Sequence, residues 1–178
     1  YTLSLHDALP ILQALLAEGY RQPLCLHLPA DHLATTRRRQ GLERACREAG
    51  LDPDTLEHSY MASGDEHYRD IPSVLLARIQ NGIPLFDSVI CGNDRIALMV
   101  YQTLLAQGLR IPEDIAVIGY DNMVGIGELF LPPLSTVQLP HYEIGRLSAL
   151  HIINGETHRE TLRVESPFLM RNSFAHPS

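Results

Sequence analysis

Four short polar side chains stand directly after two neighbouring apolar runs, and their types could bind a ligand or move a proton. Asn93 and Asp94 follow the first run, and Asp121 and Asn122 follow the second. Asp accepts hydrogen bonds and Asn both donates and accepts, so the group could hold a polar ligand. Asp94 and Asp121 could also form a general acid–base pair. Alternatively, all four are helix-cap and turn residues, because Asn and Asp are favoured at both places.

The residues around these side chains predict a unit of strand, helix and strand. An apolar run ends at Gly92, a stretch with helical spacing of apolar residues ends at Gly108, and a β-branched run begins at Ile115. This is the size of a βαβ unit, whose parallel strands bring their carboxyl ends to one edge of the sheet. We therefore expect the four polar side chains to converge there.

The rest of the chain continues this alternation. Further helices are predicted over residues 12–20, 36–49, 72–79 and 143–154, and further strands over 23–28, 56–61, 136–139, 162–165 and 168–171. Alternating strands and helices imply an α/β fold with a doubly wound parallel sheet covered on both faces.

Composition and charge argue against several classes of protein. The net charge is −7, with no basic footprint of the kind that a nucleic-acid-binding domain shows. The three cysteines, Cys25, Cys46 and Cys91, form no CxxC pair, so their spacing indicates neither a disulfide framework nor a zinc site. No apolar run approaches the ~20 residues that cross a membrane, and no signal peptide opens the sequence, which favours the cytoplasm.

The amino-acid sequence of the predicted strand–helix–strand unit, residues 87–121, resembles that of the sensor domain of LacI/GalR-type bacterial transcriptional regulators. The matching residues are Asn93-Asp94 with Ala97-Leu98, Gly108-Leu109 with Pro112 and Asp114, Gly119-Tyr120-Asp121, and Pro132-Pro133-Leu134-Ser135-Thr136. The resemblance implies a periplasmic-binding-protein-like sensor of type I with two lobes and a ligand cleft between them. This chain would supply an incomplete sensor, mainly the second lobe and the return segments that end the chain.

The resemblance also implies an effector site for a small sugar or sugar derivative. A sugar presents neighbouring hydroxyl groups, and each buried polar group left unmatched costs about 1–3 kcal/mol. Carried over to this sequence, the site residues are Arg38, which precedes Gly41 by three positions, Asn93 and Asp121, with Met61 as an apolar wall. Leu139 stands where several relatives have Gln or His, which leaves the identity of the sugar open.

The expected partners follow from the same resemblance. The sensor is expected to form a homodimer through Leu98 and Phe130, to bind operator DNA only through a helix-turn-helix outside this chain, and to need no cofactor or metal. Residues 1–11 look like the translation of a sequencing adaptor, so the sensor is expected to span residues 12–178.

Two alternatives differ in class. A periplasmic sugar-binding protein of a transporter shares the fold. An α/β hydrolase-like enzyme would use Asp94 and Asp121, but it also needs a nucleophile or a metal, and the sequence has no Gly-x-Ser-x-Gly or P-loop motif. Catalysis is therefore not expected.

Overall fold

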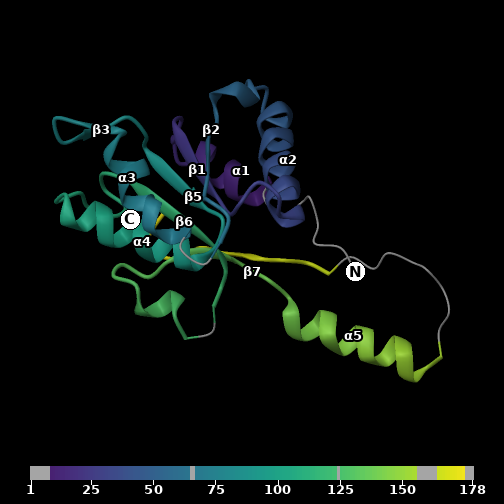
Figure 1. Cartoon of the computed structure of the whole chain (residues 1–178). Coiled ribbons are helices and arrows are strands. Elements are labelled where there is room, and N and C mark those ends of the chain that lie inside the picture. The colour runs from purple at the N-terminus through teal and green to yellow at the C-terminus, as the bar shows by residue number, and fades with distance from the viewer. Residues whose placement is uncertain (1–8, 65–66, 124, 156–163, 175–178) are drawn as a thin grey trace.

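A computed structural model describes residues 9–64, 67–123, 125–155 and 164–174, and shows a central sheet between two helical layers (Figure 1). The helices are α1 (Leu9–Ala17), α2 (Leu33–Glu48), α3 (Ile71–Leu76), α4 (Asp94–Ala106) and α5 (His141–Ile153), with short 3₁₀ turns η2 (Pro53–Thr55), η3 (His67–Asp70) and η4 (Gly127–Leu129). The strands are β1 (Pro23–His27), β2 (Glu57–Tyr60), β3 (Ile79–Gln80), β4 (Ile83–Pro84), β5 (Ser88–Cys91), β6 (Ala116–Asp121), β7 (Ser135–Gln138) and β8 (Phe168–Leu169).

The main sheet has the order β2-β1-β5-β6-β7-β8. All neighbouring strands from β2 to β7 pair in parallel, and β8 pairs antiparallel with β7. From β1 the chain adds β2 on one side of the sheet, and from β5 it adds β6 and β7 on the other side. The strand order reverses between β1 and β5, and ligands of open α/β sheets bind outside the carboxyl ends of the strands at such a point.

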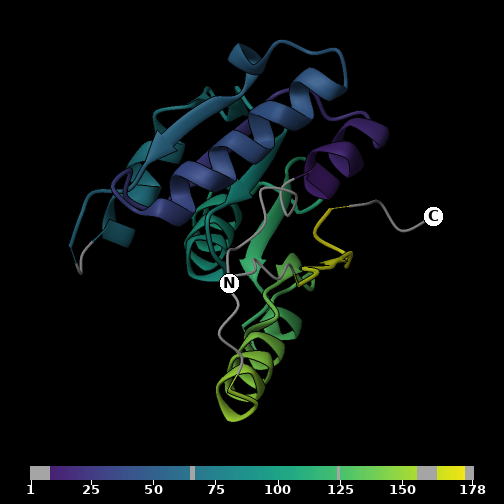
Figure 2. The same ribbon diagram turned by 90° about the vertical axis from the view of Figure 1, so that its right-hand side faces the viewer.

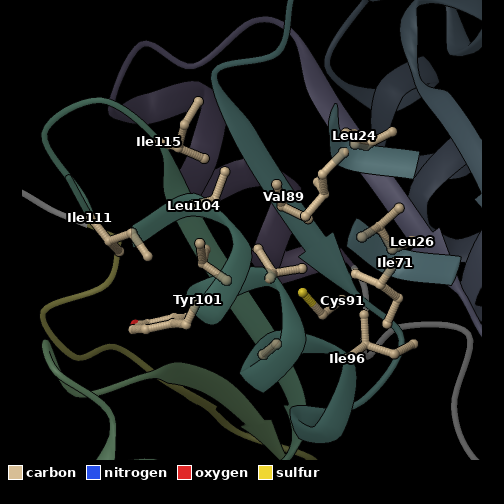
Figure 3. Close-up of a cluster of buried hydrophobic side chains, with 14 of the residues drawn as sticks. Leu24, Leu26, Ile71, Val89, Cys91, Ile96, Tyr101, Leu104, Ile111 and Ile115 are labelled. Carbon is tan, nitrogen blue, oxygen red and sulfur yellow. The ribbon is translucent and has the colours of Figure 1, made fainter. Parts of the chain in front are cut away.

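Successive strand residues point to opposite faces, and both faces are buried. On one face Leu24, Leu26, Val89 and Val117 join the cluster under α3 and α4, which Figure 3 shows with Tyr101 and Leu104. On the other face, residues such as Cys25, Ile90 and Ile118 pack with the buried side of α1 and α2. This two-sided burial explains why these strands read as continuous apolar runs, and it confirms the predicted doubly wound sheet.

Ile11 is 1% exposed and lies within α1, and residues 1–8 lie outside the described ones. Two local expectations need correction. The helix expected to run from Pro72 to Ile79 ends at Leu76. Ile79 instead starts a small hairpin, because Asn81 and Gly82 both adopt the positive φ that a tight two-residue turn needs. No strand forms at residues 164–165, and the rest of the strand expected over 162–165 lies outside the described residues.

Helix α5 differs from the other long helices because it extends away from the sheet in both views (Figures 1 and 2). None of its residues is buried, and Tyr142, Ile152 and Ile153 are at least 77% exposed. Among the described helices, none is long and apolar enough to cross a bilayer.

Candidate functional site

The polar residues of interest meet at the carboxyl ends of β1, β5 and β6, beside the point where the strand order reverses. Helix α2 leaves from the end of β1 and carries Arg38 in its second turn. Helix α4 leaves from the end of β5 and is capped by Asn93, and β6 ends at Asp121. Short connections thus bring three side chains that are far apart in the sequence to one rim.

Arg38 is held at this rim from three sides. Its Nη1 donates a hydrogen bond to the carbonyl oxygen of Gly92, and its Nη2 lies 3.8 Å from Oδ1 of Asp121. Its guanidinium carbon lies 3.8 Å from the centre of the Tyr120 ring, a cation–π contact. The planar fork is therefore oriented before any ligand arrives, which lowers the entropic cost of binding.

Asp121 combines an unusual backbone conformation with a raised carboxyl pKa. Its φ of 112° lies in the region that favours glycine, and such outliers gather at ligand sites. Burial raises the pKa of its carboxyl to about 6 and the charge of Asp94 adds to this, while the Arg38 guanidinium opposes the rise. Its side chain remains 28% exposed, so the carboxylate can accept hydrogen bonds from a ligand at the rim.

Asn93 combines a structural bond with a place beside Arg38. Its Oδ1 accepts from the backbone N–H of Ile96 at 2.8 Å and caps α4, and its Nδ2 donates to the hydroxyl of Tyr68 at 3.0 Å. The side-chain amide has two N–H donors, so one is left for a ligand. The cap interpretation therefore holds for this residue, and its role in effector binding stays a prediction.

Asp94 serves the scaffold. It is 1% exposed, its Oδ1 accepts from the Thr136 hydroxyl and its Oδ2 from the backbone N–H of Met123, each at 2.8 Å. Burial raises its pKa, and these hydrogen bonds oppose the shift. A Cβ at Gly119 would lie 2.2 Å from Oδ1, so a side chain there would displace Asp94. Because both carboxylate oxygens fix the turn after β6, Asp94 is a poor candidate for one half of an acid–base pair.

Met61 is not brought into this group. It is 3% exposed and packs in the cluster under α3 and α4, although its backbone N–H donates to the carbonyl of His27 at 3.0 Å. The residue directly before it, Tyr60, is 39% exposed and stacks on the His27 ring. The alternation of β2 continues one residue past its end and turns the Met61 side chain inward, which the sequence resemblance could not decide.

The two residues expected at a subunit contact, Leu98 and Phe130, differ in their exposure to solvent. Leu98 is 44% exposed on α4, whereas Phe130 is 6% exposed and packs edge-on against Tyr101 with ring centres 4.8 Å apart. The exposed apolar side chains of that loop are Leu129 and Leu131, at 80% and 83%. Phe130 belongs to the core because the loop alternates its side chains between core and solvent.

Two aromatic residues that contact Arg38 and Asn93 were not predicted from the sequence. Tyr120 supports Arg38 and Tyr68 supports Asn93. Tyr120 stood in the Gly-Tyr-Asp motif, directly before Asp121, and could have been found from that position. Tyr68 lies in the short turn η3, which no motif marks in the sequence, so only the fold places it beside Asn93. A cavity of about 10 Å³ lined by Arg38 is far too small to enclose a sugar ring.

Comparisons with known proteins agree with this geometry. Residues 10–172 match the family described as periplasmic binding proteins and sugar binding domain of the LacI family. The sucrose operon repressor of Escherichia coli is 56% identical over 161 residues, which are 90% of this chain and 49% of that protein. The ribose operon repressor of Escherichia coli strain K12 is 33% identical over 170 residues, 92% of this chain and 49% of that protein.

A solved structure shows the same architecture. The crystal structure of a LacI family transcriptional regulator from Silicibacter pomeroyi superposes with a TM-score of 0.77 and 26% identity, covering 97% of this chain and 63% of that one. The chain thus spans about half the length of the curated relatives that it matches.

Proposed function

Because the chain belongs to the family of periplasmic binding proteins and LacI-type sugar-binding domains, we propose that it is the effector-binding part of a sugar-responsive transcriptional repressor. The curated relatives described above are operon repressors, which favours the regulatory branch over the transport branch and over an enzyme. The observation that carries the proposal is the rim formed by Arg38, Asp121 and Asn93 at the reversal of the strand order.

The rim fits the hydrogen-bonding needs of a sugar. The Asp121 carboxylate accepts from hydroxyl groups, Arg38 donates in a fixed plane, and Asn93 keeps one donor. The 56% identity with a sucrose operon repressor makes sucrose, or one of its two component sugars, the first candidate effector.

The proposed domain division follows from the packing. We propose residues 12–139 as the second lobe, and we assign α5 to the return segments that complete the first lobe, because it buries nothing here. Residues 1–11 stay a proposed non-native segment, although Ile11 packs within α1. The DNA-binding helix-turn-helix is proposed to lie outside this chain, whose net charge of −7 does not suit operator binding.

We further propose a cytoplasmic homodimer. Leu98, Leu129 and Leu131 are exposed large apolar side chains, and exposed apolar patches mark interfaces. Charged substitutions of Leu98 and Leu131 in the full-length protein are expected to convert a dimer into a monomer by light scattering, whereas Leu105→Glu, another exposed α4 position, serves as the control.

Calorimetry on the full-length protein tests the site. Asp121→Ala is expected to weaken sugar binding at least about tenfold, because hydrogen bonds to a charged acceptor are worth roughly 1.5–3 kcal/mol. The matched control is Asp114→Ala, which removes an equal charge from a surface pair with Arg110 at 2.8 Å.

Wild type and both variants are titrated in turn with sucrose, fructose, glucose and ribose. If Asp121→Ala and wild type bind the same sugar equally well, Asp121 is a turn residue and the proposed site is wrong. If no sugar binds to the wild type, the effector class is wrong.

A further inference from the structure

A second cluster of reactive side chains lies on the α2 face of the sheet, away from the hydrogen bonds of the rim. Cys25 and His27 stand two positions apart on β1, so they share a face. His58 on β2 is the register partner of Cys25. One ligand atom of each residue lies within 4.8 Å of the ligand atoms of the other two.

The two imidazoles already face each other. Nε2 of His27 and Nδ1 of His58 are 2.8 Å apart, and the rings stack with centres separated by 5.0 Å. His27 is 3% exposed, and the other ring nitrogen of His58 is buried without a hydrogen-bond partner among the described residues. Burial lowers the pKa of both imidazoles, that of His27 to about 3. Both rings are therefore neutral at pH 7, which is the form that binds metals.

We propose that Cys25, His27 and His58 form a binding site for a divalent ion of the zinc class. Zn²⁺ prefers sulfur and imidazole nitrogen in a tetrahedron, and its bond lengths imply about 3.3 Å between two nitrogens and about 3.5 Å between nitrogen and sulfur. The two imidazole nitrogens are 2.8 Å apart, so the histidine pair has to open by about half an ångström to hold an ion. All three ligand atoms already lie within 4.8 Å of one another, so a small adjustment of the side chains suffices.

The surroundings supply a fourth ligand and a route of entry. His58 lines an open hollow of about 550 Å³ together with Glu43, Asp54 and Arg39. A water molecule from this hollow completes a three-ligand site. The positive charges of Arg38 and Arg39 act on His27, and Arg39 also acts on His58, which opposes a cation; the negative charge of Glu43 acts on His58 in the opposite sense. The thiolate of Cys25 offsets one charge of the ion.

Binding releases one proton. Burial raises the pKa of the Cys25 thiol well above its ordinary value, so the group is a thiol before the ion arrives. The Zn²⁺–S bond forms as the S–H bond breaks, and the proton goes to solvent. Affinity therefore rises with pH.

The ion would have two structural effects. It would tie β2, the edge strand of the sheet, to β1. It would also fix His27, whose side chain lines the small cavity behind Arg38.

Titration of the full chain with Zn²⁺ and Co²⁺ tests the site. Wild type is expected to bind one ion per chain, to release about one proton in calorimetry across buffers of different ionisation enthalpy, and to show a thiolate-to-cobalt absorption band. Cys25→Ser and His58→Asn are each expected to lose about a hundredfold or more in affinity, since even outer partners of metal ligands cost 10–100-fold. Cys25→Ser should also lose the band. Cys46→Ser is the matched control, because Cys46 is an equally buried thiol of the same core cluster.

Two outcomes overturn the proposal. If wild type does not bind one ion per chain in the titration, Cys25, His27 and His58 form no metal site, and the two histidines are only a hydrogen-bonded pair. Equal affinity of wild type and His58→Asn, a variant of a half-buried residue on an edge strand, places any bound ion elsewhere. Neither outcome bears on sugar binding at Asp121.

Discussion

Helices α4 and α5 each contain 13 residues and carry apolar side chains at helical spacing, yet they have opposite environments. Helix α4 buries seven residues between β5 and β6, among them Ile96, Val100 and Leu104. Helix α5 buries none. The difference shows that an amphipathic pattern marks a face that needs a partner, and that only the surrounding sheet decides whether the partner is present.

The same contrast extends to the helix ends. The side chain of Asn93 caps the first turn of α4 at the rim beside Arg38 and Asp121, whereas Pro140 before α5 makes no side-chain cap. Helix α4 is thus packed into the body of the protein, whereas α5 leaves large apolar side chains such as Ile152 and Ile153 exposed.

The largest expected effect is on core packing. Leu104→Ala is expected to lower the free energy of unfolding of the 178-residue chain by about 2–5 kcal/mol, because Leu104 is fully buried. The matched variant Leu150→Ala on α5 is expected to change it by less than about 0.5 kcal/mol. Urea denaturation measures both values. Equal losses would contradict the contrast and would mean that α5 packs in solution.

An intermediate effect is expected at Asp121, the last residue of β6. Its raised pKa means that the folded state holds the proton more tightly than the unfolded state, so the free energy of unfolding falls as the pH rises from about 4 to about 6 and is level above that. Asp121→Asn should remove this slope. The difference is on the order of 1–2 kcal/mol, less than the full shift would give, because the carboxylate is 28% exposed.

Urea denaturation at pH 4 and pH 7 for both proteins measures the slope. Asp114→Asn is the control, since its pKa is lowered to about 2 by Arg110 and its contribution runs in the opposite direction. A slope unchanged by Asp121→Asn would show that the carboxyl is not desolvated.

The smallest expected effect concerns the cap of α4. Asn93→Ala should cost about 1 kcal/mol, because the N–H of Ile96 loses its acceptor. Asn93→Ser keeps an acceptor and should recover most of that stability while losing the donor to Tyr68. Thermal unfolding compares the three proteins. If serine restores nothing, the bond to Tyr68 rather than the cap carries the stability.

The sequence by itself determined the order of elements. Continuous apolar runs, helical spacing and the glycines at positions 50 and 108, which both have positive φ, placed the main strands and helices within a few residues. Local chemistry suffices there because turns and helix ends depend on a few adjacent residues. The family resemblance pointed to Asn93, Asp121 and Arg38 as candidate site residues, and their role in effector binding stays a prediction.

Only the tertiary structure decided which face each side chain meets. Met61 and Phe130 turned into the core, and Asp94 became a buried support, because strand alternation and loop packing select one side of the chain. The cluster of Cys25, His27 and His58 has no spacing motif, since His58 arrives from the neighbouring strand after a separation of 31 residues from His27. Parallel pairing sets that register, and pairing between distant strands is a property of the whole sheet.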